Sequence, residues 1–318
     1  MRDKFNREIN YLRISVTDRC NLRCKYCMPE EGVEDIGHNK ILSFENIQRI
    51  VEASAKLGIT KYRITGGEPL VRKDIIDLVR ALSKIPGVKE LVMTTNGILL
   101  PEKAEALKEA GLKRVNISLD TLDPEKFAEI TRGGDLNKVL AGIKAAEKAG
   151  LVPLKINAVA MRGFNDDEIT SLADITKDHE YNLRFIELMP FGNNSNAKDS
   201  KYLSNEEIKS MLPTLTPLGT QGVAEVFKIP GALGTIGFIS AMSRHFCGDC
   251  NKIRLTSDGK LKTCLHSNQE IDLNEVLNTG DDELLKATIE NAIMLKEERH
   301  HLNEGAQPIT RNMNKIGG

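Results

Sequence analysis

The residues of this chain with the clearest chemical potential are its six cysteines, which fall in two sets far apart in the sequence. The two sets are Cys20, Cys24 and Cys27 near the start, and Cys247, Cys250 and Cys264 near the end. Each set holds an odd number of closely spaced thiols. In a reducing compartment this pattern favours thiolate ligation of metal over a disulfide framework.

The first set has the spacing CxxxCxxC and directly follows a short β-branched run that we predict to be a strand. Three thiolates on one loop can bind three irons of a [4Fe–4S] cubane and leave the fourth iron open for a substrate. The alternative is a zinc site whose fourth ligand comes from elsewhere, although structural zinc prefers CxxC pairs.

The second set, CGDC followed by Cys264, is again a three-thiolate set without an evident fourth ligand. It also fits a zinc ribbon completed by His245 or His266, or a group of buried structural cysteines.

The elements that must position these thiols alternate between strand and helix patterns from residue 11 to 189. We predict six strands: Leu12–Val16, Tyr62–Thr65, Glu90–Thr94, Arg114–Ser118, Leu154–Ala160 and Arg184–Leu188. We predict helices over 43–58, with Ser43 as the N-cap, and over Asp74–Lys84, Pro101–Ala110 and Leu136–Ala149. Six such units predict an incomplete (β/α)6 TIM-like barrel, with the carboxyl ends of the strands on one face.

After about residue 220 the pattern changes to short strands with glycine-containing turns, one of them at Ser257-Asp258-Gly259. We therefore predict two domains, a barrel over 1–220 and a smaller α+β module over 221–318. A charged helix is expected over Asp282–Arg299. The last nineteen residues, HHLNEGAQPITRNMNKIGG, are too polar and too rich in Gly and Pro to predict a helix.

Composition argues against several classes of partner. The 318 residues carry a formal net charge of −1, so no global charge favours nucleic acid or a membrane surface. The N-terminal residues have charges throughout and lack the apolar core of a signal peptide, and no window approaches a membrane span. We expect a cytoplasmic protein.

The first cysteine set, with Tyr26 before its last cysteine, resembles the signature of the radical S-adenosylmethionine superfamily. The resemblance implies that the open iron chelates S-adenosylmethionine and that one electron cleaves it to a 5′-deoxyadenosyl radical. Further matching segments are GGEP at 66–69, Ser118-Leu119-Asp120 and IELMP at 186–190. The S-adenosylmethionine contacts that it implies are Tyr26, Gly66, Gly67, Glu68, Ser118 and Met189.

A larger set of segments resembles one family within that superfamily, the GTP 3′,8-cyclases of molybdenum cofactor biosynthesis. The segments are LRISVTDRCNLRCKYCMP, KYRITGGEPLVR, TTNGILL, RFIELMP, CGDCNKIRLTSDGKLKTCL and the final Ile316-Gly317-Gly318. The resemblance implies a second [4Fe–4S] cluster on Cys247, Cys250 and Cys264 that meets the guanine of GTP. It also implies abstraction of the C3′ hydrogen, followed by attack of C3′ on C8.

A triphosphate carries several negative charges, so a near-neutral protein must meet it with a local group of cations. By motif position, the implied GTP contacts are Arg13, Lys61, Arg63, Thr94, Lys155, Arg184, Lys252, Ile253 and Arg254. Taken singly, each basic residue is better explained as a surface charge, whereas the joint placement of the set on or next to predicted strands favours a binding role. Lys252 stands where the family usually has Arg, which keeps the charge but loses the bidentate fork.

The tail is the other family feature. The resemblance implies that Gly317 and Gly318 reach the active site and serve cyclisation, whereas an ordinary C-terminus frays. It further implies a homodimer, an electron donor such as flavodoxin or ferredoxin, and hand-over of product to cyclic pyranopterin monophosphate synthase. The alternatives are a peptide-modifying radical enzyme with an auxiliary cluster and a zinc-stabilised nucleotide-binding protein without redox chemistry.

Overall fold

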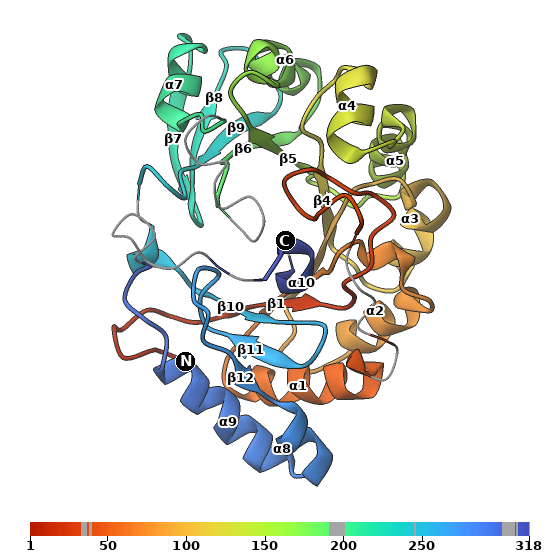
Figure 1. Ribbon diagram of the computed structural model, residues 1–318, viewed down its shortest axis with the longest axis vertical. Helices are drawn as coiled ribbons and strands as arrows, with labels where there is room; N and C mark the ends of the chain where they lie inside the picture. The colour runs from red at the N-terminus through yellow and green to blue at the C-terminus, as the bar shows by residue number, and fades with distance from the viewer. Residues whose placement is uncertain are drawn as a thin grey trace.

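The computed structural model describes residues 1–32, 37, 40–190, 201–244, 246–300, 309 and 311–317. Its centre is a row of six parallel strands that follow one another in chain order (Figure 1). They are β1 (Tyr11–Ser15), β2 (Lys61–Thr65), β3 (Glu90–Thr95), β4 (Arg114–Ser118), β5 (Lys155–Ala160) and β6 (Asn182–Glu187). The predicted incomplete barrel is confirmed, and each predicted strand is recovered with its ends shifted by at most two residues.

Helices connect these strands and cover the outside of the sheet (Figure 1). They are α1 (Phe44–Lys56), α2 (Ile75–Ser83), α3 (Leu100–Glu109), α4 (Pro124–Thr131), α5 (Leu136–Lys148) and α6 (Ile169–Asp178). The N-cap predicted for α1 is present, because the Ser43 hydroxyl accepts a hydrogen bond from the Asn46 N–H at 3.2 Å.

Two of these helices, α4 and α6, were not predicted individually. For α4 a signal was present in the sequence: Asp123 caps the helix by accepting from Glu125 N–H at 2.8 Å, and Pro124 begins it. At α6 neither terminus has a side-chain cap, so the sequence held no comparable start signal.

The later strands extend the same sheet at both of its edges. They are β7 (Thr216–Gln221), β8 (Ala224–Lys228), β9 (Thr235–Ile239), β10 (Lys252–Leu255), β11 (Lys260–Lys262) and β12 (Ile271–Asp272). At one edge β9 pairs in parallel with β6, and at the other β10 pairs in parallel with β1. The strands after residue 220 thus share one continuous sheet with the barrel, and the two-domain division at that residue remains a prediction.

The remaining helices are α7 (Asn205–Ser210), α8 (Asn274–Thr279), α9 (Asp282–Met294) and α10 (Met313–Ile316). Two expectations need correction here. The helix predicted over Asp282–Arg299 ends at Met294, and the C-terminal tail, predicted to lack a helix, forms the single turn α10. The physical reason for α10 is tertiary contact, because Ile316 and Asn314 are both buried.

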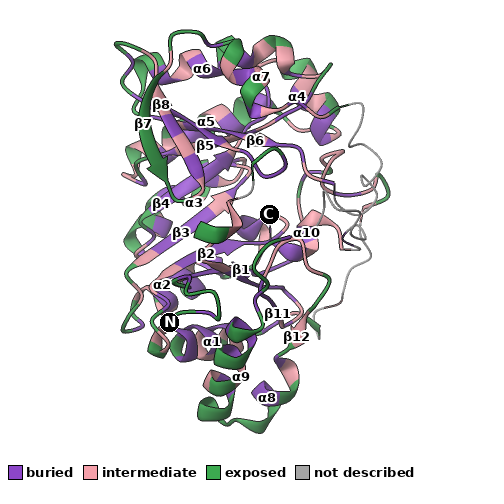
Figure 2. Cartoon of the chain, turned by 90° about the vertical axis from the view of Figure 1, so that its left-hand side faces the viewer, coloured by how far each residue is buried: buried purple, intermediate pink, exposed green. Residues whose placement is uncertain are grey.

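The core lies between the strands and the helices, and Figure 2 shows the strands mostly buried and the outer helix faces exposed. Its largest fully buried side chains include Tyr62, Phe185 and Phe238. Strand β7 is exposed along its whole length. Among the described helices, none has the length and apolar character needed to cross a bilayer.

Candidate functional site

The first cysteine set lies on the loop after β1, and all three thiols are half-buried. The loop curls on itself through a 2.9 Å hydrogen bond from Cys27 N–H to Cys24 O, and it docks on the end of α4, where Lys25 N–H donates to Ile130 O. The three thiols lie near enough to affect one another electrostatically, because the charges of Cys20 and Cys27 raise the pKa of Cys24 in addition to its burial.

This donor set fits a cubane cluster, which binds its three thiolates through three separate irons. Within the described ranges, no three His, Cys, Asp or Glu side chains form a group that could hold a single metal ion.

Tyr26 connects this loop to the end of β4. Its hydroxyl donates to Asp120 Oδ2 at 2.7 Å, while Asp120 Oδ1 accepts from Val159 N–H at 2.8 Å. Burial raises the pKa of Asp120 to about 6, against the opposing effect of these hydrogen bonds. Tyr26 therefore holds the cysteine loop against the carboxyl ends of β4 and β5.

The glycines at 66 and 67 allow two backbone segments to meet. A Cβ on Gly67 would lie 2.2 Å from Arg19 O, and one on Gly66 would lie 2.7 Å from Thr17 O. The close approach is made by the residues just before Cys20, because Gly67 N–H donates to Thr17 O at 2.7 Å. The glycines thus fix the start of the cysteine loop.

Glu68 is 1 % exposed and continues this contact towards β3. Its carboxylate accepts from Thr95 Oγ1 at 2.8 Å and from Asn96 N–H at 2.7 Å. Burial raises the pKa of Glu68 to about 7, although these hydrogen bonds oppose the shift. Asn96 in turn approaches Cys20 Sγ with its Nδ2 at 3.9 Å, so the carboxylate orients a neighbour of the first cysteine.

Ser118 ends β4 and is half-buried, and Met189 lies just after β6. Met189 packs against a small apolar cluster formed by Ile309, Leu265, Met313 and Ile316. The structure therefore places this predicted S-adenosylmethionine contact beside the C-terminal tail.

The second cysteine set begins in a short 3₁₀ helix, Cys247–Asp249, and ends just after β11. Its three thiols are half-buried and close together, because the charges of Cys264 and Cys250 both raise the pKa of Cys247, after burial. Cys250 differs: burial opposes its ionisation, but the ammonium groups of Lys296 and Lys252 outweigh that effect and lower its pKa. This donor set also fits a cluster.

Lys296 binds the backbone on both sides of the second set. It is 2 % exposed and donates from Nζ to Lys252 O at 3.0 Å and also to Thr263 O. The zinc alternative named two histidines. The His266 ring is tilted against the His300 ring, with centroids 4.7 Å apart, and His245 lies outside the described residues.

The predicted GTP contacts gather in two rows across neighbouring strands. Arg254 on β10, Arg13 on β1 and Arg63 on β2 are register partners and form one row. Side chains two residues apart on a strand share a face, so a second row runs parallel to it. That row consists of Lys252, Tyr11 and Lys61.

Tyr11 was missed by the sequence analysis, although its alternation with Arg13 was a usable signal. Its ring has Lys61 Nζ at 5.1 Å, the Arg63 guanidinium carbon at 5.6 Å and Lys252 Nζ at 5.9 Å from the centroid. The aromatic face therefore separates cations that would otherwise repel one another directly.

Arg13, Lys252 and Arg254 in these rows are poorly solvated and repel other cations of the rows, whereas Lys61 pairs with Glu90 at 2.7 Å. Burial, then the charges of Arg254 and Arg63, lower the pKa of Arg13 well below its usual range. Burial lowers the pKa of Lys252 to about 8 and that of Arg254 to about 10. Such an arrangement favours occupation by a multiply charged anion.

The same surface continues to β3, β5 and β6. Arg63 Nη1 donates to Thr94 Oγ1 at 3.2 Å, and burial followed by the Arg184 charge lowers the pKa of Lys155 to about 7. Arg184 is 3 % exposed, and its Nη1 is buried without a hydrogen-bond partner in the part of the chain that the structure describes. That orphaned donor fits an anion acceptor.

Gln221 and Arg114 are two further residues that the sequence analysis missed. Gln221, at the end of β7, accepts from Lys155 Nζ at 2.9 Å and also from Arg184 Nη2. Arg114 is buried beside them and pairs with Glu90 at 2.6 Å. Arg114 carries a strand-alternation signal, whereas the position of Gln221 depends on the β7–β8 hairpin folding back over the sheet.

Ile253 is the exception among the predicted GTP contacts. It is fully buried in the main core, on the face of β10 opposite its two basic neighbours. Any contact that it makes with a ligand must use its backbone.

The C-terminal tail runs between the two cysteine sets. Asn314 donates from its backbone N–H to Cys27 and lowers the pKa of that thiol, although burial raises it to about 12 overall. Three residues later, Gly317 O accepts from Arg254 Nη1 at 2.6 Å. Gly317 therefore lies at the cation rows, and Gly318 lies outside the described residues.

Two family models match this chain and divide it between them. The Radical SAM superfamily matches residues 14–175, about half of the chain, and Molybdenum Cofactor Synthesis C matches residues 181–302. The first covers most of β1 to α6 with the first cysteine set, and the second covers β6 to α9 with the second set.

Curated relatives and solved structures agree with these matches. The chain is 50 % identical over 321 residues to the GTP 3′,8-cyclase of Alkaliphilus metalliredigens, with both chains covered in full. It is 52 % identical to the GTP 3′,8-cyclase of Peptoclostridium acidaminophilum over 99 % of this chain and 98 % of that one.

Among solved structures, Streptococcus suis SuiB bound to S-adenosylmethionine has a similar fold, with a TM-score of 0.64 and 17 % identity. The similarity covers 97 % of this chain and 77 % of that one. The family match, the full-length relatives and the two rows of cations beside a cysteine loop agree, and the chain is a radical S-adenosylmethionine enzyme that belongs to the GTP 3′,8-cyclase family.

Proposed function

We propose that this enzyme converts GTP into (8S)-3′,8-cyclo-7,8-dihydroguanosine 5′-triphosphate, the first step of molybdenum cofactor biosynthesis. The observation that carries the proposal is the pair of cation rows on β10, β1 and β2, which lies between two three-thiol sets. The names of the full-length relatives support the same activity.

In this proposal Cys20, Cys24 and Cys27 hold the first [4Fe–4S] cluster. When bound, this cluster supplies the electron that cleaves S-adenosylmethionine and yields the 5′-deoxyadenosyl radical. The proposed contacts of S-adenosylmethionine lie at the carboxyl ends of β1, β2, β4 and β6. They are Tyr26, Gly66, Gly67, Glu68, Ser118 and Met189.

In this proposal Cys247, Cys250 and Cys264 would hold a second [4Fe–4S] cluster, which would supply a binding position for the guanine. The buried Lys296 supports the assignment, because it anchors Lys252 O and Thr263 O and so joins the two segments that carry Cys250 and Cys264.

The cations bind and orient the triphosphate. The proposed contacts are Arg13, Lys61, Arg63, Thr94, Lys155, Arg184, Lys252 and Arg254, with Ile253 acting through its backbone. Arg side chains hold phosphate oxygens in a planar fork, which restricts rotation of the nucleotide better than a point charge does. Fixing the nucleotide keeps C3′ within reach of the radical, because correct placement of the two reactants accounts for much of such a rate.

Burial of the cations adds a second effect. Because Arg63, Arg184 and Arg254 are each less than a tenth exposed, their attraction for phosphate is less screened than at an exposed surface. A nucleotide held there also excludes water from the radical, which prevents its quenching. Gly317 and Gly318 serve cyclisation from the tail.

Several partners follow from family membership and are part of the proposal. We expect a cytoplasmic homodimer, reduction by flavodoxin or ferredoxin, and transfer of the product to cyclic pyranopterin monophosphate synthase.

The decisive experiment incubates anaerobic, iron-reconstituted protein with S-adenosylmethionine, dithionite and GTP. Mass spectrometry should detect 5′-deoxyadenosine together with an isomer of GTP of unchanged mass. If 5′-deoxyadenosine forms without the isomer, the radical chemistry stands and the substrate is wrong. If neither forms and the purified protein holds zinc, both cluster assignments fall.

A further inference from the structure

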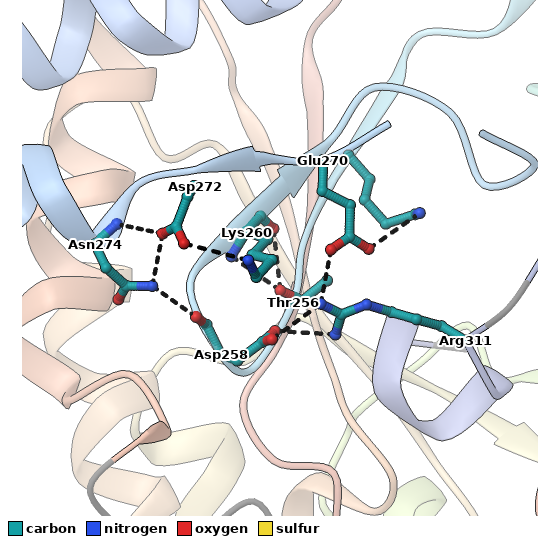
Figure 3. Close-up of polar contacts among 8 residues, drawn as sticks. Thr256, Asp258, Lys260, Glu270, Asp272, Asn274 and Arg311 are labelled. Atoms are coloured by element: carbon teal, nitrogen blue, oxygen red, sulfur yellow. Dashed lines mark hydrogen bonds and ion pairs between the residues drawn. The ribbon is translucent and has the colours of Figure 1, made fainter. Parts of the chain in front are cut away.

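The last described part of the C-terminal tail, residues 311–317, is attached to the rest of the enzyme by the ion pairs of Arg311, which we call the ionic anchor (Figure 3). Arg311 Nη1 donates to Asp258 Oδ1 at 3.1 Å, and Arg311 Nη2 donates to Asp258 Oδ2 at 2.9 Å. The same Nη2 donates to Glu270 Oε2 at 2.7 Å. Arg311 thus spans two carboxylates with the bidentate geometry that a lysine cannot reproduce.

The ion pairs of the anchor are screened less by water than a surface ion pair, because the side chains on both sides are mostly buried. About a fifth of each side chain is exposed: 20 % for Arg311, 18 % for Asp258 and 17 % for Glu270. Burial acts against the charge of Arg311, but the hydrogen bond and charge of Asp258 outweigh it and raise its pKa. Arg311 lowers the pKa of Asp258 in turn, so these two groups stay charged.

Contacts outside the tail also hold the residues that carry the two carboxylates. Asp258 lies in the β10–β11 turn, where Asn274 Nδ2 donates to its carbonyl at 2.8 Å. Gly259 next to it has φ +85°, and a Cβ there would lie 2.6 Å from Asn274 Oδ1. Glu270 Oε1 accepts from the fully buried Lys262 at 3.3 Å. Asp258 and Glu270 thus each have a further contact besides Arg311 (Figure 3).

The far end of the tail meets the same hairpin. Arg254, four residues before Asp258 on β10, donates to Gly317 O at 2.6 Å. Between the two ends, Asn314 Nδ2 donates to Asp18 O at 3.0 Å, and Ile316 packs with Met189 and Leu265. The β10–β11 hairpin therefore contacts the tail at both Arg311 and Gly317. The separation of these two contact points on the hairpin sets how far the tail can reach.

There is little room for the tail to shift. Gly317 has φ +80°, and a Cβ on it would lie 2.5 Å from Thr65 Oγ1 and 3.3 Å from Ser15 Cβ. A slip by one residue would bring the Ile316 side chain into this narrow place. We propose that Arg311 is a positioning residue: its anchor to Asp258 and Glu270 sets the register of the tail, so that Gly317 faces the cation rows.

The contribution of this register to catalysis rests on the proposed function, whereas the anchor itself does not. Two measurements keep them apart. The first is hydrogen–deuterium exchange of the tail in anaerobic holoenzyme with both clusters reconstituted. The second is the ratio of 5′-deoxyadenosine to cyclised GTP in turnover.

The variants are Arg311→Gln, Arg311→Lys and the matched control Arg80→Gln, which breaks an exposed pair with Asp77 on α2. In Arg311→Gln we expect amides of 312–317 to exchange at least about tenfold faster, while a peptide from β1 exchanges as in wild type. Arg311→Lys should be intermediate because it keeps the charge and loses the fork. Arg80→Gln should leave exchange in the tail unchanged.

A cycle with Asp258→Asn tests the partner. If the two side chains act through each other, the double variant should exchange no more than about twofold faster than Arg311→Gln alone. In turnover, Arg311→Gln should form several times more 5′-deoxyadenosine per cyclised GTP, with unchanged iron content.

Unchanged exchange of the tail in Arg311→Gln would overturn the anchor. Faster exchange with an unchanged product ratio would overturn its role in positioning Gly317. If wild-type enzyme forms no cyclised GTP, the proposed function fails, and exchange alone then decides the anchor.

Discussion

The two cysteine sets present the same three thiols in opposite electrostatic surroundings. In the first set, burial raises the pKa of Cys20 to about 11, and the Glu68 carboxylate adds to the shift. In the second, burial also opposes ionisation of Cys250, but Lys296 and Lys252 lower its pKa. The spacing of the cysteines does not produce this difference, which comes from side chains that folding places beside each set: Glu68 after β2, Lys252 on β10 and Lys296 after α9.

The difference matches two kinds of ligand. Carboxylates beside the first set, Glu68 and Asp120, suit a ligand that carries an ammonium and a sulfonium group. Cations beside the second set suit a polyanion. Each of the following experiments tests this difference between the two cysteine sets.

The largest effect is expected from removing one thiol of either set. Cys24→Ala and Cys250→Ala should each lower bound iron from about eight to about four atoms per chain, because each loses one cluster. Cys24→Ala should abolish 5′-deoxyadenosine formation, whereas Cys250→Ala should keep S-adenosylmethionine binding and lose cyclised GTP. Iron analysis and mass spectrometry measure these outcomes. Equal loss of S-adenosylmethionine binding in both variants would contradict separate roles.

Arg254→Ala should weaken GTP binding by about 10- to 100-fold, the range for one charge-assisted hydrogen bond. Binding of S-adenosylmethionine should change little, because Arg254 lies on the side of the second set. Anaerobic calorimetry with each ligand measures both constants. Arg49→Ala, which breaks a surface contact with Asp282, is the control. A matching loss for both ligands would remove the contrast.

The affinity for GTP should depend on pH through Lys155. Burial and Arg184 lower its pKa to about 7, so the ammonium is charged below that pH and neutral above it. Bound phosphate favours the charged form, so affinity should fall as pH rises above 7, by up to about tenfold. Lys155→Arg should remove the part of this fall centred near pH 7 and keep the part centred near pH 8, where Lys252 titrates, and calorimetry from pH 6 to 9 tests it. A wild-type affinity that stays flat would exclude Lys155 as a titrating contact.

The smallest effect is expected from Tyr26→Phe, which removes the 2.7 Å hydrogen bond to Asp120. The cysteine loop should then hold the first cluster less firmly and lose its iron several times faster to a chelator, while iron in the second set is unaffected. Tyr181→Phe, which removes a hydroxyl contact with Glu147, is the matched control. Absorbance of the clusters follows the loss, and identical rates in all three proteins would remove Tyr26 from the loop's support.

Much of the fold could be predicted from the sequence, because the patterns that indicate its strands and helices are local. Alternating short β-branched runs and capped helices predicted six parallel strands, and all six are present. The Ser257-Asp258-Gly259 turn was predicted from its composition and does join β10 to β11. Helix α6 and the single turn α10 were missed, because α6 has no side-chain cap and α10 exists only through its contacts.

Part of the candidate site was readable for the same reason. The cysteine sets and the basic residues on alternating strand positions stand out in the sequence, and the structure places those residues on neighbouring strands. The structural reason for glycine at positions 66 and 67 could not be predicted from the sequence. They admit Thr17 O and Arg19 O, a contact between segments almost fifty residues apart.

The cysteine sets and the strands that carry cations could thus be predicted from the sequence, because both depend on the spacing of residues along the chain. Only the tertiary structure decided that Arg254 lies beside Arg13, since β10 joins β1 across about 240 residues and no local pattern encodes that register. It also decided that Arg311 holds the tail to Asp258 and Glu270. A charged side chain shows its partner only after folding has brought the two together.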